Sequence, residues 1–181
     1  MTLASVVNFL FGSLTVVAGI GVLGLVLGWF FGKKKTIQVF FTEQGVLIAF
    51  SAVLIAVFGS LIYSEVLGYE PCKLCWIQRI FFYPQVVILG FALWGRHKGS
   101  LALIDSAFVL SILGGVVALY HYLLQLGLIP EGFCVAVGSA VSCAKQFVLA
   151  FGYITIPMMS LSAFALIIFS LQLARSRSLL V

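Results

Sequence analysis

The chain has 181 residues, of which 63% are hydrophobic and only 8% are charged, and its mean hydropathy is +1.24. A soluble domain carries about 25% charged residues, so this composition excludes a water-soluble globule and predicts an all-α integral membrane protein. The formal net charge of +5 requires no nucleic-acid partner, because the basic residues are placed where they orient helices in a membrane.

Long stretches with few charges predict five transmembrane helices. A helix needs roughly 20 residues to cross the hydrocarbon core of a bilayer. The third apolar stretch reaches this length only if its helix begins near Cys75, which places Arg79 about one turn inside. The expected helices cover residues 5–31, 44–65, 75–95, 101–124 and 150–173.

The first apolar stretch, residues 1–32, has no charge and is followed by Lys33, Lys34 and Lys35. A secretory signal peptide would have a basic region before its apolar run, and that run would be shorter. We therefore expect a retained transmembrane helix here.

The distribution of basic residues predicts the orientation. Seven of the ten lie on one side of the expected helices, and excess Lys and Arg mark the cytoplasmic side. The N-terminus is then outside and the C-terminus is cytoplasmic. All four cysteines fall on the outer side, where disulfides persist. The seven residues are Lys33, Lys34, Lys35, Arg96, Lys98, Arg175 and Arg177.

The stretch "YEPCKLCWIQR" places Cys72 and Cys75 at the start of the third helix. Free backbone N–H groups and the helix dipole favour a thiolate there, and Pro71 suits a helix entry. Cys75 and Arg79 are four residues apart and share a helix face. Arg79 can thus stabilise a thiolate or a reduced anionic ligand, unless it is only an interfacial anchor.

A second pair, Cys134 and Cys143, lies in the outer loop of about residues 125–149. Two pairs on one oxidising face suggest thiol–disulfide exchange from pair to pair. Two static structural disulfides, or a metal held by the CxxC half-site, are the alternatives. His121, in "LYHYLLQ", is either a site residue or an ordinary hydrogen-bonded helix histidine.

Three segments together resemble the DsbB family of membrane disulfide bond formation proteins, closest to the BdbC type. They are "SEVLGYEPCKLCWIQRIFFYPQVVILG", "YHYLLQ" and "GYITIPMMSLSAF", and the likeness covers about residues 46–172. The resemblance implies a four-helix, quinone-binding bundle over residues 44–181. Residues 1–43 would then form an additional transmembrane helix with a basic cytoplasmic connection.

The resemblance also implies a role for each cysteine. Cys134 would be attacked by a soluble thioredoxin-fold oxidase of the DsbA or BdbD kind, and Cys143 would then pair with Cys72. Cys75 would engage a membrane quinone, either ubiquinone or menaquinone. Arg79, Gln78 and His121 would bind that quinone, with no metal involved, although other members can carry an acidic residue at the position of Gln78.

The expected function is thus a protein-disulfide:quinone oxidoreductase in the bacterial plasma membrane, with its cysteines on the extracytoplasmic face. A vitamin K epoxide reductase-like enzyme is a near alternative, but its loop pair usually precedes the CxxC motif, and here it follows. A membrane scaffold with two structural disulfides is the non-catalytic alternative. The loop pair is closer together than in the better-known periplasmic members.

Overall fold

The computed structural model describes residues 2–30, 34–94, 100–130, 134 and 141–178, and its described secondary structure is dominated by helices. The elements are α1 Leu3–Phe30, α2 Lys34–Leu61, the π-helical turn η1 Ile62–Val66, α3 Lys73–Leu93, α4 Leu101–Gln125 and α6 Ile156–Ser178.

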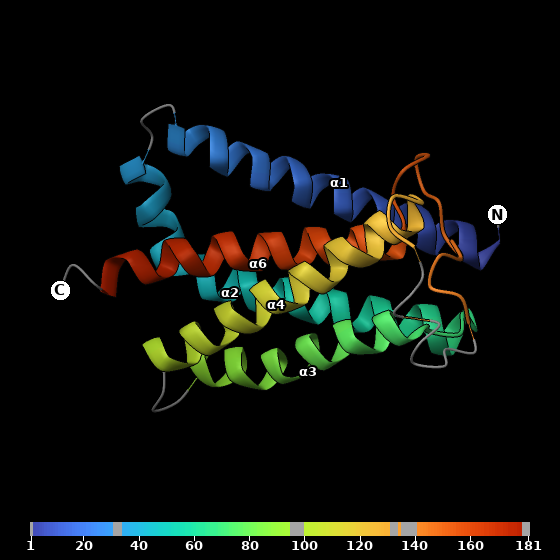
Figure 1. The fold of residues 1–181 in the computed structure, drawn as a ribbon. Coiled ribbons are helices and arrows are strands. Elements are labelled where there is room, and N and C mark those ends of the chain that lie inside the picture. Colours follow the sequence, from blue (N-terminus) through green and yellow to red (C-terminus); the bar gives the residue numbers. More distant parts are fainter. Residues whose placement is uncertain (1, 31–33, 95–99, 131–133, 135–140, 179–181) are drawn as a thin grey trace.

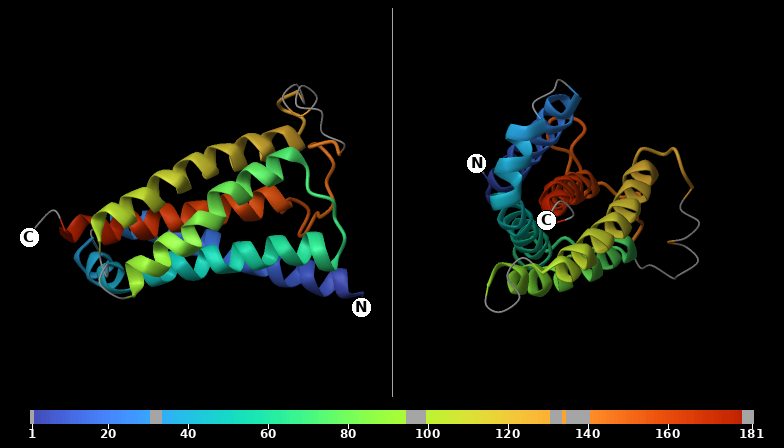
Figure 2. Two further views of the ribbon diagram at one scale, coloured as in Figure 1. Left: turned by 90° about the horizontal axis from the view of Figure 1, so that it is seen from below. Right: turned by 90° about the vertical axis from the view of Figure 1, so that its left-hand side faces the viewer.

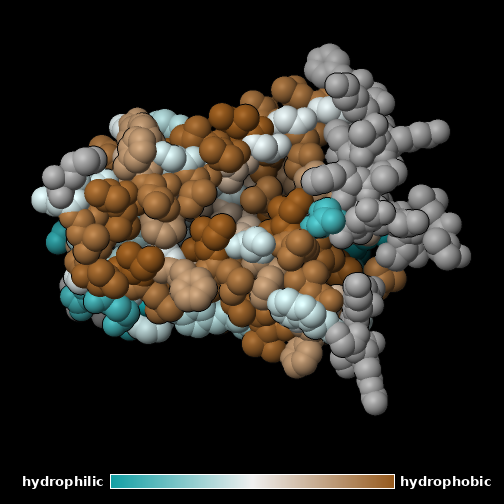
Figure 3. Space-filling model, turned by 180° about the vertical axis from the view of Figure 1, so that it is seen from behind, coloured by the Kyte–Doolittle hydropathy of each residue, from teal (hydrophilic) through white to brown (hydrophobic). Residues whose placement is uncertain are grey.

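Five helices within the described ranges are long and apolar enough to span a membrane, which confirms the predicted integral membrane fold. Large apolar side chains lie on their outward faces, where more than half of the surface of Val17, Ile80 and Val116 is exposed. Figure 3 shows the same property on one side of the molecule as a broad apolar surface. Such a surface is stable in contact with lipid and unfavourable in contact with water.

Helices α2, α3, α4 and α6 form a four-helix bundle in which each helix packs against two others, and α1 lies alongside α2 and α6 (Figures 1 and 2). The N-terminus lies at the end of the bundle that carries the loop after α4, and the C-terminus lies at the opposite end. The five spans therefore leave the two termini on opposite sides. Of the basic residues used to predict orientation, Lys33, Arg96 and Lys98 lie outside the described residues.

Close helix packing at the bundle centre depends on one glycine. Phe164 of α6 is fully buried and stacks on Phe82 of α3, with the ring centroids 3.9 Å apart. A Cβ atom at Gly114 of α4 would lie 2.3 Å from the Phe164 ring. The missing side chain at Gly114 is thus what lets α4 approach the aromatic pair.

The last helix begins later than predicted. The sequence predicts a helix from residue 150, but α6 starts at Ile156, after a turn closed by a bridge between Ala150 and Ile154. Phe151 and Gly152 in this turn have positive φ angles of 52° and 81°, which a right-handed helix does not accommodate. The hydrophobicity of this segment concealed the turn.

Candidate active site

The CxxC pair lies at the N-terminus of α3. Cys72 is the N-cap residue, only 5% exposed, and Cys75 follows in the first turn. Both are free thiols, and their sulfur atoms lie 3.2 Å apart. The backbone changes from extended to helical at Cys72, so the pair sits where the free N–H groups of the helix favour negative charge.

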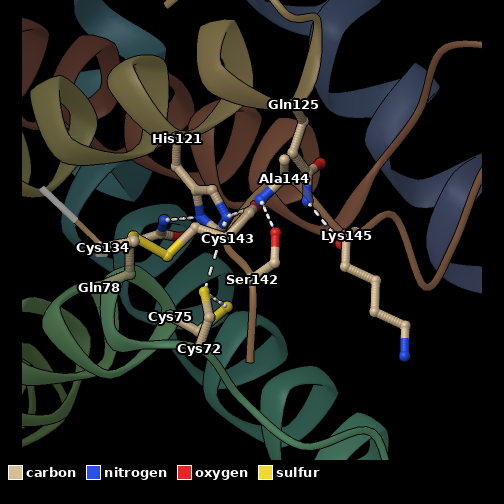
Figure 4. The surroundings of a disulfide bond; sticks show 10 residues. All are labelled: Cys72, Cys75, Gln78, His121, Gln125, Cys134, Ser142, Cys143, Ala144 and Lys145. Carbon is tan, nitrogen blue, oxygen red and sulfur yellow. Dashed lines mark hydrogen bonds between the residues drawn. A yellow bond between two sulfur atoms is a disulfide. The ribbon is translucent and has the colours of Figure 1, made fainter. Parts of the chain in front are cut away.

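The loop pair forms a disulfide between Cys134 and Cys143. It is buried, with 2% and 1% of these residues exposed, and it belongs to the same apolar cluster as Cys72 and Leu124. Figure 4 shows the disulfide beside the CxxC pair, although about sixty residues separate the two pairs along the chain. This proximity favours exchange between the pairs over two independent structural bridges.

His121 of α4 contacts one residue of each pair (Figure 4). Its Nε2 atom is 3.7 Å from the sulfur of Cys72 and 3.1 Å from the carbonyl oxygen of Cys143. Its Nδ1 atom is 3.0 Å from the side-chain nitrogen of Gln78. His121 is only 1% exposed, so Gln78 and the loop hold the ring in one orientation towards Cys72.

These contacts identify Cys72 as the thiol that ionises readily. The pKa of Cys72 is lowered from its ordinary value to about 4, first by its hydrogen bond with Cys75 and then by its hydrogen bond with His121, whereas burial opposes the shift. The thiolate is the form that attacks disulfides. The sequence favours a thiolate at this pair and places Arg79 beside Cys75, whereas the contact of His121 with Cys72 depends on how α3 and α4 pack.

We expect the replacement His121→Ala to raise the pKa of Cys72, because one hydrogen bond to the thiolate is lost. In the reduced protein, alkylation of Cys72 should stay fast until the pH falls towards about 4, and in the variant it should slow at higher pH. Trypsin cleaves after Lys73, so mass spectrometry can follow Cys72 and Cys75 on separate peptides. His121→Gln, which keeps a hydrogen-bonding group, should show a smaller change. Identical pH profiles for all three proteins would contradict the assigned role.

Arg79 is buried, with 6% exposure, and is held by the end of α2. Its guanidinium group donates hydrogen bonds to the hydroxyl and carbonyl oxygens of Ser60 and to the hydroxyl of Ser64, at 2.8–2.9 Å. It also lies 5.2 Å from the centre of the Trp76 ring. A snorkelling anchor would place its charge in water, so this burial favours a role inside the site.

Ser60 and Ser64, which hold Arg79, are not indicated by the sequence. They flank the start of the π-helical turn η1, where the helix widens at the end of α2. Single π-turns inside α-helices are often found at functional sites. Two serines four residues apart are common in membrane helices, so no sequence signal set this pair apart before Arg79 was placed beside it.

A cavity of about 250 Å³ extends from the CxxC pair into the apolar part of the bundle. Cys75, Gln78 and Arg79 line one part of it, and the rest of its lining is predominantly apolar. His121 does not line this cavity but a smaller one of about 50 Å³, which also contacts Cys72. Cys75 and Arg79 line both cavities, so Cys75 lies where the cavity beside Cys72 and His121 meets the larger one.

Cys72, Cys75 and His121 also offer three potential metal ligands, with the donor atoms all within 4.8 Å of one another. This set differs from the one weighed from sequence, in which the loop cysteines supplied the second half of the site. The loop cysteines are joined to each other, and a disulfide sulfur is not the thiolate ligand that zinc prefers. The four-cysteine site weighed from the sequence is therefore not formed in this structure.

The fold and the site define a helical membrane protein equipped for thiol–disulfide chemistry. The family model for disulfide bond formation protein DsbB matches residues 42–174. Disulfide bond formation protein C of Bacillus subtilis (strain 168) is 42% identical over 120 residues, which are 64% of this chain and 80% of that protein. The SPbeta prophage-derived disulfide bond formation protein B of the same organism is 45% identical over 109 residues, 60% and 70% of the two chains.

A more distant relative, the probable disulfide formation protein of Metapseudomonas resinovorans, is 33% identical over 132 residues, 73% of this chain and 90% of that protein. No solved structure gives a significant match. The chain belongs to the DsbB family of membrane disulfide bond formation proteins. This result confirms the resemblance to that family.

Proposed function

We propose that the protein is a thiol:quinone oxidoreductase that reoxidises a soluble thioredoxin-fold disulfide donor. The observation that carries this proposal is the position of Cys75. It lines both the small cavity that Cys72 and His121 contact and the larger apolar cavity. Electrons can thus enter from an aqueous thiol and leave to an acceptor dissolved in the membrane. A scaffold with static bridges would need no such connection.

The proposed exchange conserves atoms and electrons. A thiolate of the reduced donor attacks Cys134, its sulfur bonds to that of Cys134, and Cys143 leaves as a thiolate. The donor's second thiolate then attacks its first sulfur and the bond to Cys134 breaks, so that the oxidised donor is released and both loop cysteines are reduced. Cys143 then attacks Cys72 of a Cys72–Cys75 disulfide, and Cys75 leaves as a thiolate. Cys134 attacks Cys143 and displaces Cys72, which restores the loop bridge and leaves two thiols at the CxxC pair. Each cycle transfers two electrons and two protons from the donor to the CxxC pair.

The loop disulfide is buried, so an attacking thiolate reaches Cys134 only when that residue moves away from Leu124 and the apolar cluster. We infer that docking of the donor moves Cys134 out of this cluster. Cys143 is already held close to Cys72 through His121, which suits the transfer between pairs.

The larger cavity fits a quinone. Its lining is predominantly apolar, as a prenylated ring requires, and Gln78 and Arg79 supply hydrogen-bond donors next to Cys75. A bound quinone accepts the two electrons and two protons that the CxxC thiols give up when they form a disulfide. Arg79, fixed by Ser60 and Ser64, would stabilise negative charge at this end of the cavity.

The distribution of basic residues supports a location in the bacterial plasma membrane with the cysteines outside and the C-terminus in the cytoplasm. Redox titration in cells tests the function. In quinone-depleted cells the cysteines should accumulate as thiols, and resupplied quinone should return them to disulfides. Cysteines whose redox state ignores quinone would contradict the proposal and support two structural bridges.

A further inference from the structure

Helix α1 forms part of the wall of the larger cavity, although the family match does not include it. The family model begins at residue 42, whereas α1 ends at Phe30. The same helix packs alongside α2 and α6 (Figure 2). The cavity-lining residues of α1 are Phe11, Leu14, Thr15, Val17 and Ala18.

Close contacts fix α1 in this position near the end that carries the cysteines. The ring of Phe11 packs against Gly59 of α2, where a Cβ atom would lie only 2.7 Å from the ring, and against Tyr63, with centroids 5.7 Å apart. A Cβ atom at Gly12 would lie 3.1 Å from Ala150 and Phe151. At both places a glycine leaves room for an aromatic ring or a methyl group of the neighbouring segment. Such complementary packing holds α1 in one position against the bundle.

The exposure of the lining residues shows where the cavity opens. Thr15 is buried, with 8% exposure, whereas Leu14 and Val17 of α1 are 40% and 67% exposed. Ile55 of α2 also lines the cavity and is 45% exposed. The apolar opening therefore lies between α1 and α2, among side chains that face lipid in a membrane.

We propose that α1 forms the lipid-facing wall of the quinone site, so that the prenyl tail leaves the cavity through the opening between α1 and α2. This inference rests on the proposed function. The occupant follows from the lining, because Cys75, Gln78 and Arg79 supply polar and redox groups at one part of the cavity and the opening to lipid is apolar. A prenylated quinone has this combination of a polar ring and an apolar tail.

The test compares two substitutions on adjacent residues of α1. Ala18 lines the cavity, whereas a Cβ atom at Gly19 would meet nothing within 4 Å. Ala18→Phe should therefore fill the cavity, and Gly19→Phe should add the same ring on the outside. The purified full-length proteins are titrated with a ubiquinone analogue and a menaquinone analogue, each with a ten-carbon tail, and the dissociation constants are measured calorimetrically.

We expect Ala18→Phe to raise the dissociation constant roughly tenfold to a hundredfold, the scale of overpacking a filled site, and Gly19→Phe to leave it unchanged. Stoichiometric oxidation of a reduced thioredoxin-fold donor, without quinone, should remain normal in both variants and thereby show that they fold. Equal affinities in all three proteins, or equal losses in both variants, would overturn the role of α1 while leaving the proposed function intact. Absence of quinone binding by the unaltered protein would overturn both.

Discussion

Replacing Cys75 with serine is expected to abolish quinone-dependent turnover, because Cys75 is the cysteine that lines the larger cavity. Serine has nearly the same volume but cannot form a disulfide, so no electrons can pass from the CxxC pair. The loop disulfide should still oxidise one equivalent of reduced donor. Quinone reduction and donor oxidation are followed in parallel by absorbance and by thiol trapping.

The matching substitution at the other end of the relay is Cys134→Ser. It should prevent oxidation of the donor while the CxxC pair, once reduced chemically, still reduces quinone. The two variants thus lose opposite halves of the reaction. Normal donor oxidation at catalytic rates in Cys134→Ser or Cys143→Ser would show that the two-pair relay is wrong.

The second large effect is expected for Arg79→Ala. A charge-assisted hydrogen bond contributes about 1.5–3 kcal/mol, which corresponds to roughly a tenfold to hundredfold rise in the KM for quinone. Arg79→Lys should retain part of the activity, because it keeps the charge but loses the planar group that reaches both Ser60 and Ser64.

Lys73→Ala provides the matched control for Arg79, since Lys73 is an exposed cation in the first turn of the same helix. It should leave quinone kinetics unchanged. Steady-state rates at varied quinone concentration, with donor in excess, separate KM from kcat in all three variants. Unchanged kinetics in Arg79→Ala would reduce Arg79 to a structural link between α2 and α3.

The membrane-spanning helices were predictable because a bilayer demands long apolar stretches, and these are visible in the sequence. The start of α6 was not, because the turn around Phe151 and Gly152 is as apolar as the helix that follows. Phe151 is 53% exposed, so this turn presents apolar side chains outward as a lipid-facing helix does, and hydrophobicity does not distinguish the two.

The site was predictable where its residues are close in sequence and unpredictable where packing assembles it. The CxxC motif and Arg79 share one helix, so their spacing alone indicated a common site. His121 was found through the resemblance, but its place beside Cys72 depends on how α3 and α4 pack. The serines that hold Arg79 and the contribution of α1 to the cavity arise in the same way, from contacts between helices distant in the chain.

The central claim is that two cysteine pairs pass electrons from an aqueous thiol to a membrane quinone. The most direct measurement mixes the purified protein with a reduced thioredoxin-fold donor and a quinone, and counts both products over many turnovers. We predict one quinone reduced for each donor disulfide formed, with no activity when either reactant is left out. Donor oxidation at full rate without quinone, or no quinone reduction in the complete mixture, would contradict the account.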